Sequence, residues 1–150
     1  NCVRRFVDAQ IVGHMTQERL STGSHELAPP IPVTLIPRGW HFEGEIILLV
    51  GEGNGGTSEV FICDMSQLDA VTMMGDTTRG TGNWISLIRA LPDGWYVTCP
   101  NITLLAPDSS YVEDAGLLPD VIVNSTPDDF QNGYDPVLEA AFNHLGAQVP

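Results

Sequence analysis

The chain has 150 residues, of which 43% are hydrophobic, so it can form one domain with a core and a wholly disordered chain is excluded. Nineteen acidic residues against six basic residues give a formal net charge of −13, which disfavours nucleic acid and anionic membrane surfaces as partners. All six basic residues are arginines, so this chain cannot supply a catalytic lysine. The longest apolar run, residues 46–50, is far too short for a membrane span.

The N-terminal segment shows apolar residues at helical spacing. This pattern predicts an amphipathic helix from Val3 to about Met15. Prolines, serines and a glycine then predict a loop over residues 21–37, with a short extended piece at residues 33–36. Because the first residue is Asn rather than Met, we expect the chain to be processed or to be part of a longer protein.

The middle of the chain predicts one β-α-β unit. A continuous apolar run over residues 45–50 predicts a central strand that is buried on both faces. A glycine loop over residues 51–56, a helix from residue 57 to about residue 68 and a second strand at residues 70–74 complete the unit. Thr57 or Ser58 should cap the helix. This order implies that part of the sheet is parallel.

The remainder of the chain predicts short strands and a final helix. A second loop rich in glycine and threonine covers residues 75–82. Strands at residues 84–91 and 95–99 flank Pro92-Asp-Gly, which is typical of a hairpin turn. Further strands are predicted at residues 102–106 and 121–123. Asp135 as N-cap, followed by proline, predicts the start of a helix that ends at Gly146.

Several residues are candidates for chemistry. The 51–56 loop offers backbone amides to an anion or oxyanion, but a tight strand-to-helix turn is the simpler explanation of its glycines. It has neither the lysine of a P-loop nor the spacing of a dinucleotide fingerprint. Ser58 lies where an elbow could present a nucleophile, or it caps the helix. Glu113 and Asp114 have the context of turn carboxylates.

The histidines and cysteines predict no metal site and no cofactor. No two of the four histidines have metal-ligand spacing on a helix. His14 is expected to end the first helix, and His144 to lie on the surface of the last helix or to pack there. The three cysteines, Cys2, Cys63 and Cys99, are too few and too widely spaced for a disulfide framework. One disulfide bridge with one free thiol is still an open alternative.

Five motifs, in the same order as in the family, resemble the tail-specific (C-terminal processing) serine proteases. They begin at the strand of residues 47–50, with Gly55-Gly-Thr-Ser-Glu-Val-Phe, and continue at residues 75–82, 91–94, 113–120 and 133–138. The resemblance covers roughly residues 44–145. It implies an α/β, crotonase-like (ClpP/crotonase) fold with a β-β-α core. It also implies that residues 1–150 are the C-terminal part of one catalytic domain, and it favours an extracytoplasmic or secreted protein.

The resemblance further assigns catalytic positions, because the family cuts proteins with a Ser–Lys pair. The nucleophile's position is three residues before Glu59 and is Gly56 here, while the lysine's position is Thr81. Both catalytic side chains are therefore missing, and Ser–Lys peptide hydrolysis should be absent. The implied protein is a non-proteolytic or repurposed relative that binds a peptide or small molecule in a cleft bordered by Gly55, Gly56, Thr57 and Thr81.

Other functions stay open at this point. One is an active serine endopeptidase that uses Ser58 or residues from a missing part, although the Ser58 side chain would point about 200° around the helix from position 56. A related branch of the family uses Ser, His and Glu, and Glu113 matches the approximate place of its glutamate. A purely structural subunit is a third class. Exposed apolar surface is expected to be covered by a second chain or by the missing N-terminal half.

Overall fold

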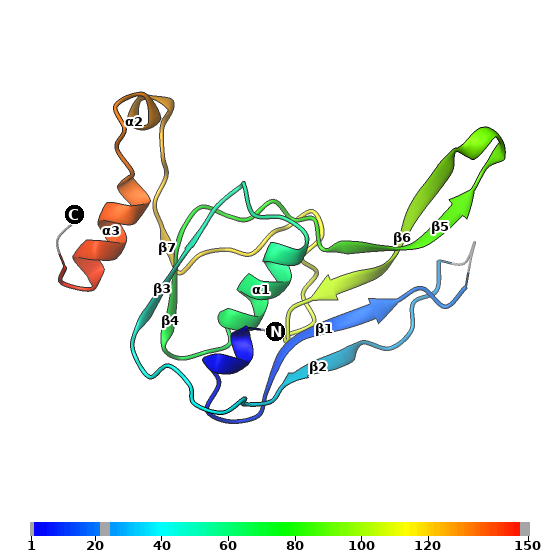
Figure 1. Ribbon diagram of the computed structural model, residues 1–150, viewed down its shortest axis with the longest axis horizontal. Helices are drawn as coiled ribbons and strands as arrows, with labels where there is room; N and C mark the ends of the chain where they lie inside the picture. The colour runs from blue at the N-terminus through cyan, green and yellow to red at the C-terminus, as the bar shows by residue number, and fades with distance from the viewer. Residues whose placement is uncertain (1, 22–24, 148–150) are drawn as a thin grey trace.

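The computed structural model describes residues 2–21 and 25–147, which form an α/β fold with two sheets (Figure 1). The antiparallel sheet contains, in spatial order, β2 (Ile31–Leu35), β1 (Ile11–Glu18), β6 (Tyr96–Leu105) and β5 (Asn83–Ala90). The parallel sheet contains β3 (Ile46–Val50), β4 (Val71–Gly75) and β7 (Val121–Ile122). Helix α1 (Thr57–Met65) lies between the two sheets.

The N-terminal segment is not the predicted helix. Only Val3–Arg5 form a short 3-10 helix, η1, and the chain then becomes β1. Both edges of β1 are hydrogen-bonded, one to β2 and one to β6. The prediction of a helix from Val3 to Met15 is therefore wrong, because strand pairing and the β-branched Ile11 and Val12 outweigh the helical spacing. The short extended piece expected within the following loop is present as β2.

The predicted β-α-β unit is confirmed, with β3 and β4 parallel and joined by α1. The helix differs in its ends, because Gly56 is its N-cap and it stops at Met65. Within the described residues β3 is an edge strand with β4 as its only neighbour, and Leu49 is 40% exposed. The expectation of a central strand buried on both faces is thus wrong for this chain.

Helix α1 joins the cores of the two sheets. One cluster of buried residues contains Val3, Val7, Leu35 and Met65. The other contains Val50, Ile62 and Met73. Because α1 contributes Met65 to the first cluster and Ile62 to the second, and because burying each such side chain contributes about 1.5–3 kcal/mol, packing fixes the helix in place. The start of α1, where the candidate site lies, is therefore anchored from both sides.

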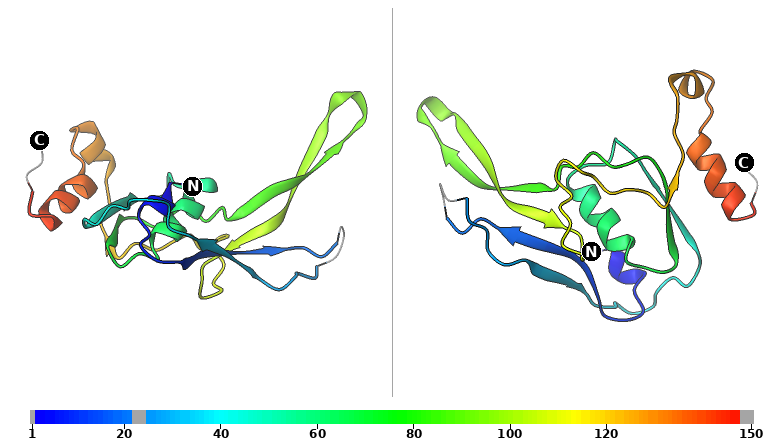
Figure 2. Two further views of the ribbon diagram at one scale, coloured as in Figure 1. Left: turned by 60° about the horizontal axis from the view of Figure 1, so that its bottom comes forward. Right: turned by 180° about the vertical axis from the view of Figure 1, so that it is seen from behind.

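The β5–β6 hairpin extends away from the rest of the chain (Figure 2). Its turn contains η2 (Pro92–Gly94), with φ of 61° at Asp93 and 79° at Gly94, as an Asp-Gly hairpin turn requires. The predicted hairpin is confirmed. Strand β6 is continuous, whereas the sequence predicted two separate strands over its length.

The C-terminal helices lie at the opposite end of the molecule from the hairpin (Figure 2). Helix α3 (Pro136–His144) starts as predicted, because the Asp135 carboxylate accepts hydrogen bonds from the amides of Val137 and Leu138. Helix α2 (Pro127–Gln131) was not predicted. Among the described residues, no helix has the length and apolar character needed to cross a membrane.

Candidate functional site

Two loops meet beyond the carboxyl ends of β3 and β4. Residues 51–56 follow β3, and residues 76–82 follow β4. Ligands of open parallel sheets bind in this position, outside the carboxyl ends of the strands. A polar pocket of about 480 Å³ lies here, lined by Glu52, Gly53, Asp76, Thr77, Thr78 and Arg79.

Glu59, in the first turn of α1, ties the two loops together. Its side chain is 0% exposed, and both carboxylate oxygens are fully engaged. Oε1 accepts hydrogen bonds from the Thr78 hydroxyl and the Gly80 amide, both at 2.6 Å. Oε2 accepts from the amides of Gly56 at 3.0 Å and Thr81 at 2.8 Å, and from the Thr81 hydroxyl at 3.2 Å.

These contacts determine the charge of Glu59. Burial by itself would raise the pKa of Glu59, because it disfavours the ionised form. The hydrogen bonds from the Thr78 hydroxyl and from the amides of Gly80, Thr81 and Gly56 outweigh burial and lower this pKa below its usual value. Glu59 is therefore a buried carboxylate at neutral pH that holds the loops, rather than a proton donor.

Gly56 occupies a sharp turn between strand and helix. Its φ of 61° and ψ of −121° form a backbone conformation that is costly for any residue with a side chain. A Cβ atom placed at this position would meet nothing within 4 Å, so a side chain there would point into open space. A strained turn that exposes one side chain is the geometry of a nucleophile elbow. In this chain the elbow position carries no side chain.

Thr81 stands directly beside this elbow. The Gly56 amide donates a hydrogen bond to Thr81 Oγ1 at 2.8 Å. A Cβ atom at Gly55 would lie only 2.6 Å from the same hydroxyl oxygen. The structure thus brings Gly55, Gly56 and Thr81 into one contact group, with Thr57 exposed at the first position of α1. This group borders the polar pocket between the loops, but none of its residues lines that pocket.

Ser58 is held by a local contact. Its Oγ donates a hydrogen bond to the Gly55 carbonyl at 3.0 Å, and its side chain is half-buried. In the described part of the chain, the Ser58 hydroxyl therefore bonds to a backbone carbonyl and not to a histidine, which could serve a serine nucleophile as its base. The contact is that of a helix-terminal serine.

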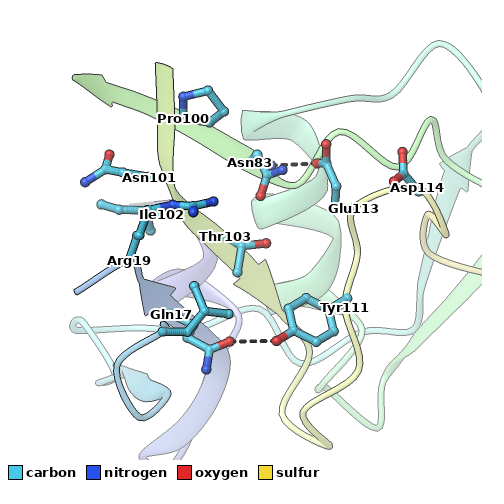
Figure 3. Close-up of a pocket in the computed structure, with 11 residues that line it drawn as sticks. Gln17, Arg19, Asn83, Pro100, Asn101, Ile102, Thr103, Tyr111, Glu113 and Asp114 are labelled. Carbon is cyan, nitrogen blue, oxygen red and sulfur yellow. Dashed lines mark hydrogen bonds between the residues drawn. The ribbon is translucent and has the colours of Figure 1, made fainter. Parts of the chain in front are cut away.

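Glu113 lies in the wall of a neighbouring pocket, beside the antiparallel sheet (Figure 3). Its Oε2 accepts a hydrogen bond from the backbone amide of Asn83 at 2.9 Å. Its backbone also passes close to Gly82, where an added Cβ would be 3.1 Å from the Glu113 amide nitrogen. Glu113 is therefore adjacent to the loop that carries Thr81, but it does not line the pocket between the two loops.

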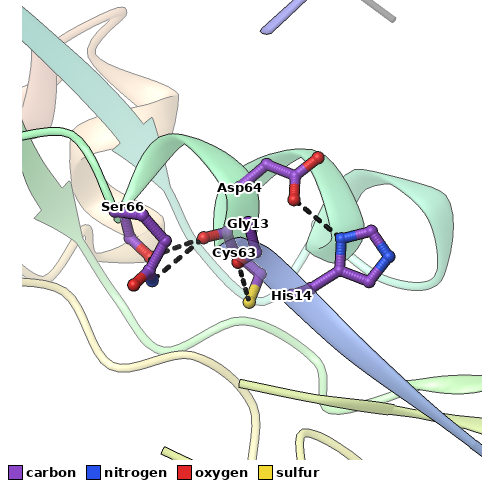
Figure 4. Close-up of polar contacts among 6 residues, drawn as sticks. Gly13, His14, Cys63, Asp64 and Ser66 are labelled. Atoms are coloured by element: carbon purple, nitrogen blue, oxygen red, sulfur yellow. Dashed lines mark hydrogen bonds and ion pairs between the residues drawn. The ribbon is translucent and has the colours of Figure 1, made fainter. Parts of the chain in front are cut away.

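A buried histidine–carboxylate pair joins α1 to the antiparallel sheet (Figure 4). His14 Nδ1 on β1 and Asp64 Oδ1 on α1 are 2.7 Å apart, and the Trp84 ring packs edge-on against the imidazole. A Cβ atom at Gly13 would collide with the Asp64 carboxylate, so only glycine permits this approach. His14 was expected at the end of a helix; because that segment is a strand, His14 faces α1 instead.

Sequence reasoning missed the roles of Glu59 and Asp64. For Glu59 a signal existed, since Gly56 and Glu59 have the spacing of an N-cap and the N3 residue that bonds back to it. For Asp64 there was no such signal, because 50 residues separate it from His14 and only the fold brings them together.

All three cysteines are free thiols, so no disulfide is present. Cys2 and Cys99 are exposed, whereas Cys63 is buried. Burial, together with the charges of Asp64 and Asp108, raises the pKa of Cys63 to about 12. In the described part of the chain, no group of three or more His, Cys, Asp or Glu residues could hold a metal ion.

The sequence is similar to those of several known peptidases. The tricorn protease of Thermoplasma acidophilum is 30% identical over 103 residues, which are 68% of this chain and 10% of that protein. A protein of Staphylococcus epidermidis named as a probable CtpA-like serine protease is 34% identical over 83 residues, which are 55% of this chain and 16% of that protein. The chain therefore spans only a small part of these relatives.

Solved structures agree on the fold. A candidate peptidase of Parabacteroides merdae has a TM-score of 0.84 and 29% identity, over 98% of this chain and 46% of that chain. The photosystem II D1 C-terminal processing protease has a TM-score of 0.59 and 21% identity, over 81% of this chain and 29% of that chain. These matches confirm the α/β protease fold and the resemblance to C-terminal processing proteases. The model of peptidase family S41 matches residues 3–123, and the chain belongs to this family.

Proposed function

We propose that this protein is a member of the S41 family that has lost Ser–Lys proteolysis and binds a peptide or small molecule in the cleft between its two glycine loops. One observation carries the proposal. Gly56, at the elbow, has no side chain, and the residue that contacts it from the second loop is Thr81 rather than an amine.

The chemistry of the two residues supports this proposal. Glycine has no group that could form an acyl-enzyme, and a threonine hydroxyl cannot act as the base near neutral pH. Loss of a hydrolase nucleophile lowers turnover by about a millionfold. No lysine elsewhere in the chain can replace the amine, because the sequence contains none. What the chain keeps is the N-terminus of α1, whose partial positive charge favours an anionic or carbonyl group.

We further propose that these residues are the C-terminal part of one crotonase-like catalytic domain, completed by another part of the protein or by a second chain. The likeness to the P. merdae structure extends over 46% of that chain, which agrees with this view. Large apolar side chains on the hairpin and on α2 support it, since they are open to solvent: Ile88, Trp95, Tyr96 and Phe130. If light scattering shows that the isolated 150-residue chain is a soluble, well-behaved monomer, this second proposal is wrong.

The decisive experiment combines turnover and binding in the full-length protein. A chemically unfolded protein substrate should remain uncleaved, and a fluorophosphonate should label no serine. A set of unstructured peptides should include ligands whose binding is detected by calorimetry. Gly56→Asn should abolish that binding by placing a side chain in the open space above the elbow.

The matched control is Gly146→Asn, because Gly146 also has a positive φ, of 65°, and an added Cβ would meet nothing there. This control should bind the peptides like the unmodified protein. Cleavage of the unfolded substrate that disappears in Ser58→Ala would overturn the proposal and make Ser58 the nucleophile. Peptide binding that survives Gly56→Asn would place the ligand elsewhere.

A further inference from the structure

A second pocket, of about 360 Å³, lies beside Glu113 (Figure 3). Its walls come from segments far apart in the sequence: β1, β6, the start of β5 and the residues around Tyr111. It shares no lining residue with the pocket between the glycine loops. It is nevertheless adjacent to that site, since Glu113 lies close to Gly82 in the second loop.

Two hydrogen bonds hold the walls of this pocket in place. The Tyr111 hydroxyl and Gln17 Oε1 are 2.8 Å apart, and they connect the 111–114 segment to β1. The backbone amide of Asn83 donates to Glu113 Oε2 at 2.9 Å, and this bond connects the same segment to β5. Figure 3 shows both bonds. A pocket whose walls are already fixed loses little conformational freedom when a ligand enters.

The polar groups of the pocket are mainly hydrogen-bond acceptors. The carboxylates of Glu113 and Asp114 line it. Asn101 Oδ1 and Thr103 Oγ1 are buried without any hydrogen-bond partner. The Asn101 side-chain nitrogen donates to Glu18 Oε1 at 3.1 Å, so in this side chain only the oxygen lacks a partner. A buried oxygen that accepts no hydrogen bond costs folding free energy. A ligand that carries N–H or O–H donors, or a water molecule, would remove that cost.

Charge also favours a cationic group. The lining residues include two carboxylates and one guanidinium, that of Arg19, which gives a net charge of −1. The chain as a whole carries a net charge of −13, which attracts cations and repels anions. Leu27, Pro100 and Ile102 add apolar surface for the methylene groups of a long side chain.

From these observations we infer that the pocket beside Glu113 binds the positively charged side chain of a basic residue, with the carboxylate of Glu113 as its counter-ion. The inference deepens the proposed function and rests on it for the statement that the basic residue belongs to a bound peptide. It makes the protein selective for peptides with an arginine or lysine next to the segment that occupies the cleft.

The test uses two small probes and the full-length protein. N-acetyl-arginine amide and N-acetyl-citrulline amide have nearly the same shape and differ in charge. We expect the arginine probe to bind at least tenfold more tightly than the citrulline probe in calorimetry. Glu113→Gln should remove this difference, while its side-chain oxygen can still accept the Asn83 hydrogen bond and keep the wall intact.

Glu43→Gln is the matched control, because the Glu43 side chain is 83% exposed and does not line the pocket. It should keep the tenfold preference. Equal binding of the two probes, or a preference that survives Glu113→Gln, would overturn the inference. The proposed function is tested separately: it is wrong if unstructured peptides do not bind or if the unfolded substrate is cleaved. Neither result depends on which of the two probes this pocket prefers.

Discussion

The amide nitrogen of Gly56 lies 2.8 Å from the hydroxyl oxygen of Thr81, although 25 residues separate them in the chain. These are the two positions at which the resemblance to the Ser–Lys peptidases places the nucleophile and the base. That the two positions correspond to the catalytic pair stays a proposal, and their contact agrees with it. The contact runs through the Gly56 backbone amide, whereas a side chain at position 56 would point into open space.

Gly56→Ser should destabilise the protein without creating a steric clash. The added side chain points into open space, but the φ of 61° is unfavourable for serine. We expect the free energy of unfolding to fall by about 1–3 kcal/mol, measured by urea denaturation. Gly53→Ser is the control, because an added Cβ also meets nothing there and no positive φ is required, so its effect should stay within about 0.5 kcal/mol. Equal effects of the two changes would contradict the strained geometry of position 56.

Glu59→Gln should be strongly destabilising at neutral pH. A glutamine amide would turn its NH2 group toward donors such as the Gly80 or Thr81 amides, which now donate to a carboxylate. We expect the free energy of unfolding to fall by about 2–4 kcal/mol. Glu43→Gln, which neutralises an exposed carboxylate, should change it by less than about 0.5 kcal/mol.

The same carboxylate should make stability depend on pH. The pKa of Glu59 is lower in the folded chain than its usual value near 4.5, so the unfolded chain binds the proton more readily. Its contribution is therefore fully present above about pH 4.5 and is lost as the pH falls through the folded pKa. Urea denaturation between pH 7 and pH 3 should show a smaller acid-induced loss of stability in Glu59→Gln than in the unmodified protein. Identical pH profiles would show that Glu59 does not titrate as described.

Gly75→Ala should be more damaging than most alanine substitutions. Gly75 ends β4 with a φ of 131°, and a Cβ atom there would collide with the Val50 carbonyl oxygen of β3. The two strands would have to separate where the loops of the candidate site begin. We expect a loss of at least about 2 kcal/mol in the free energy of unfolding. Gly51→Ala, where nothing lies within 4 Å of the added atom, should be tolerated.

Cys63 should resist alkylation in the folded protein. It is fully buried, and its pKa of about 12 keeps it a thiol at pH 8, whereas the thiolate is the reactive form. Mass spectrometry after iodoacetamide treatment should find Cys63 unmodified until denaturant is added. Labelling of Cys63 in the native protein at the rate of the exposed Cys99 would contradict its placement.

Local patterns in the sequence were sufficient for the β3–α1–β4 unit, the Asp-Gly hairpin and the start of α3. Each of these elements depends on residues that are close in the chain: an apolar run, a turn dipeptide or a capping carboxylate with a proline. The spacing of Gly56 and Thr81 was likewise visible in the sequence, because the motifs around them occur in a fixed order.

Other features depend on contacts between residues far apart in the chain, and only the tertiary structure decided them. The segment after Val7 became a strand because β2 and β6 supply hydrogen bonds on both sides, and apolar spacing could not reveal those partners. Glu59 gained its role only when the second loop folded over it, and Asp64 only when β1 brought His14 within 2.7 Å. A buried carboxylate needs donors from distant segments to stay charged, so its function depends on contacts that the order of residues does not display.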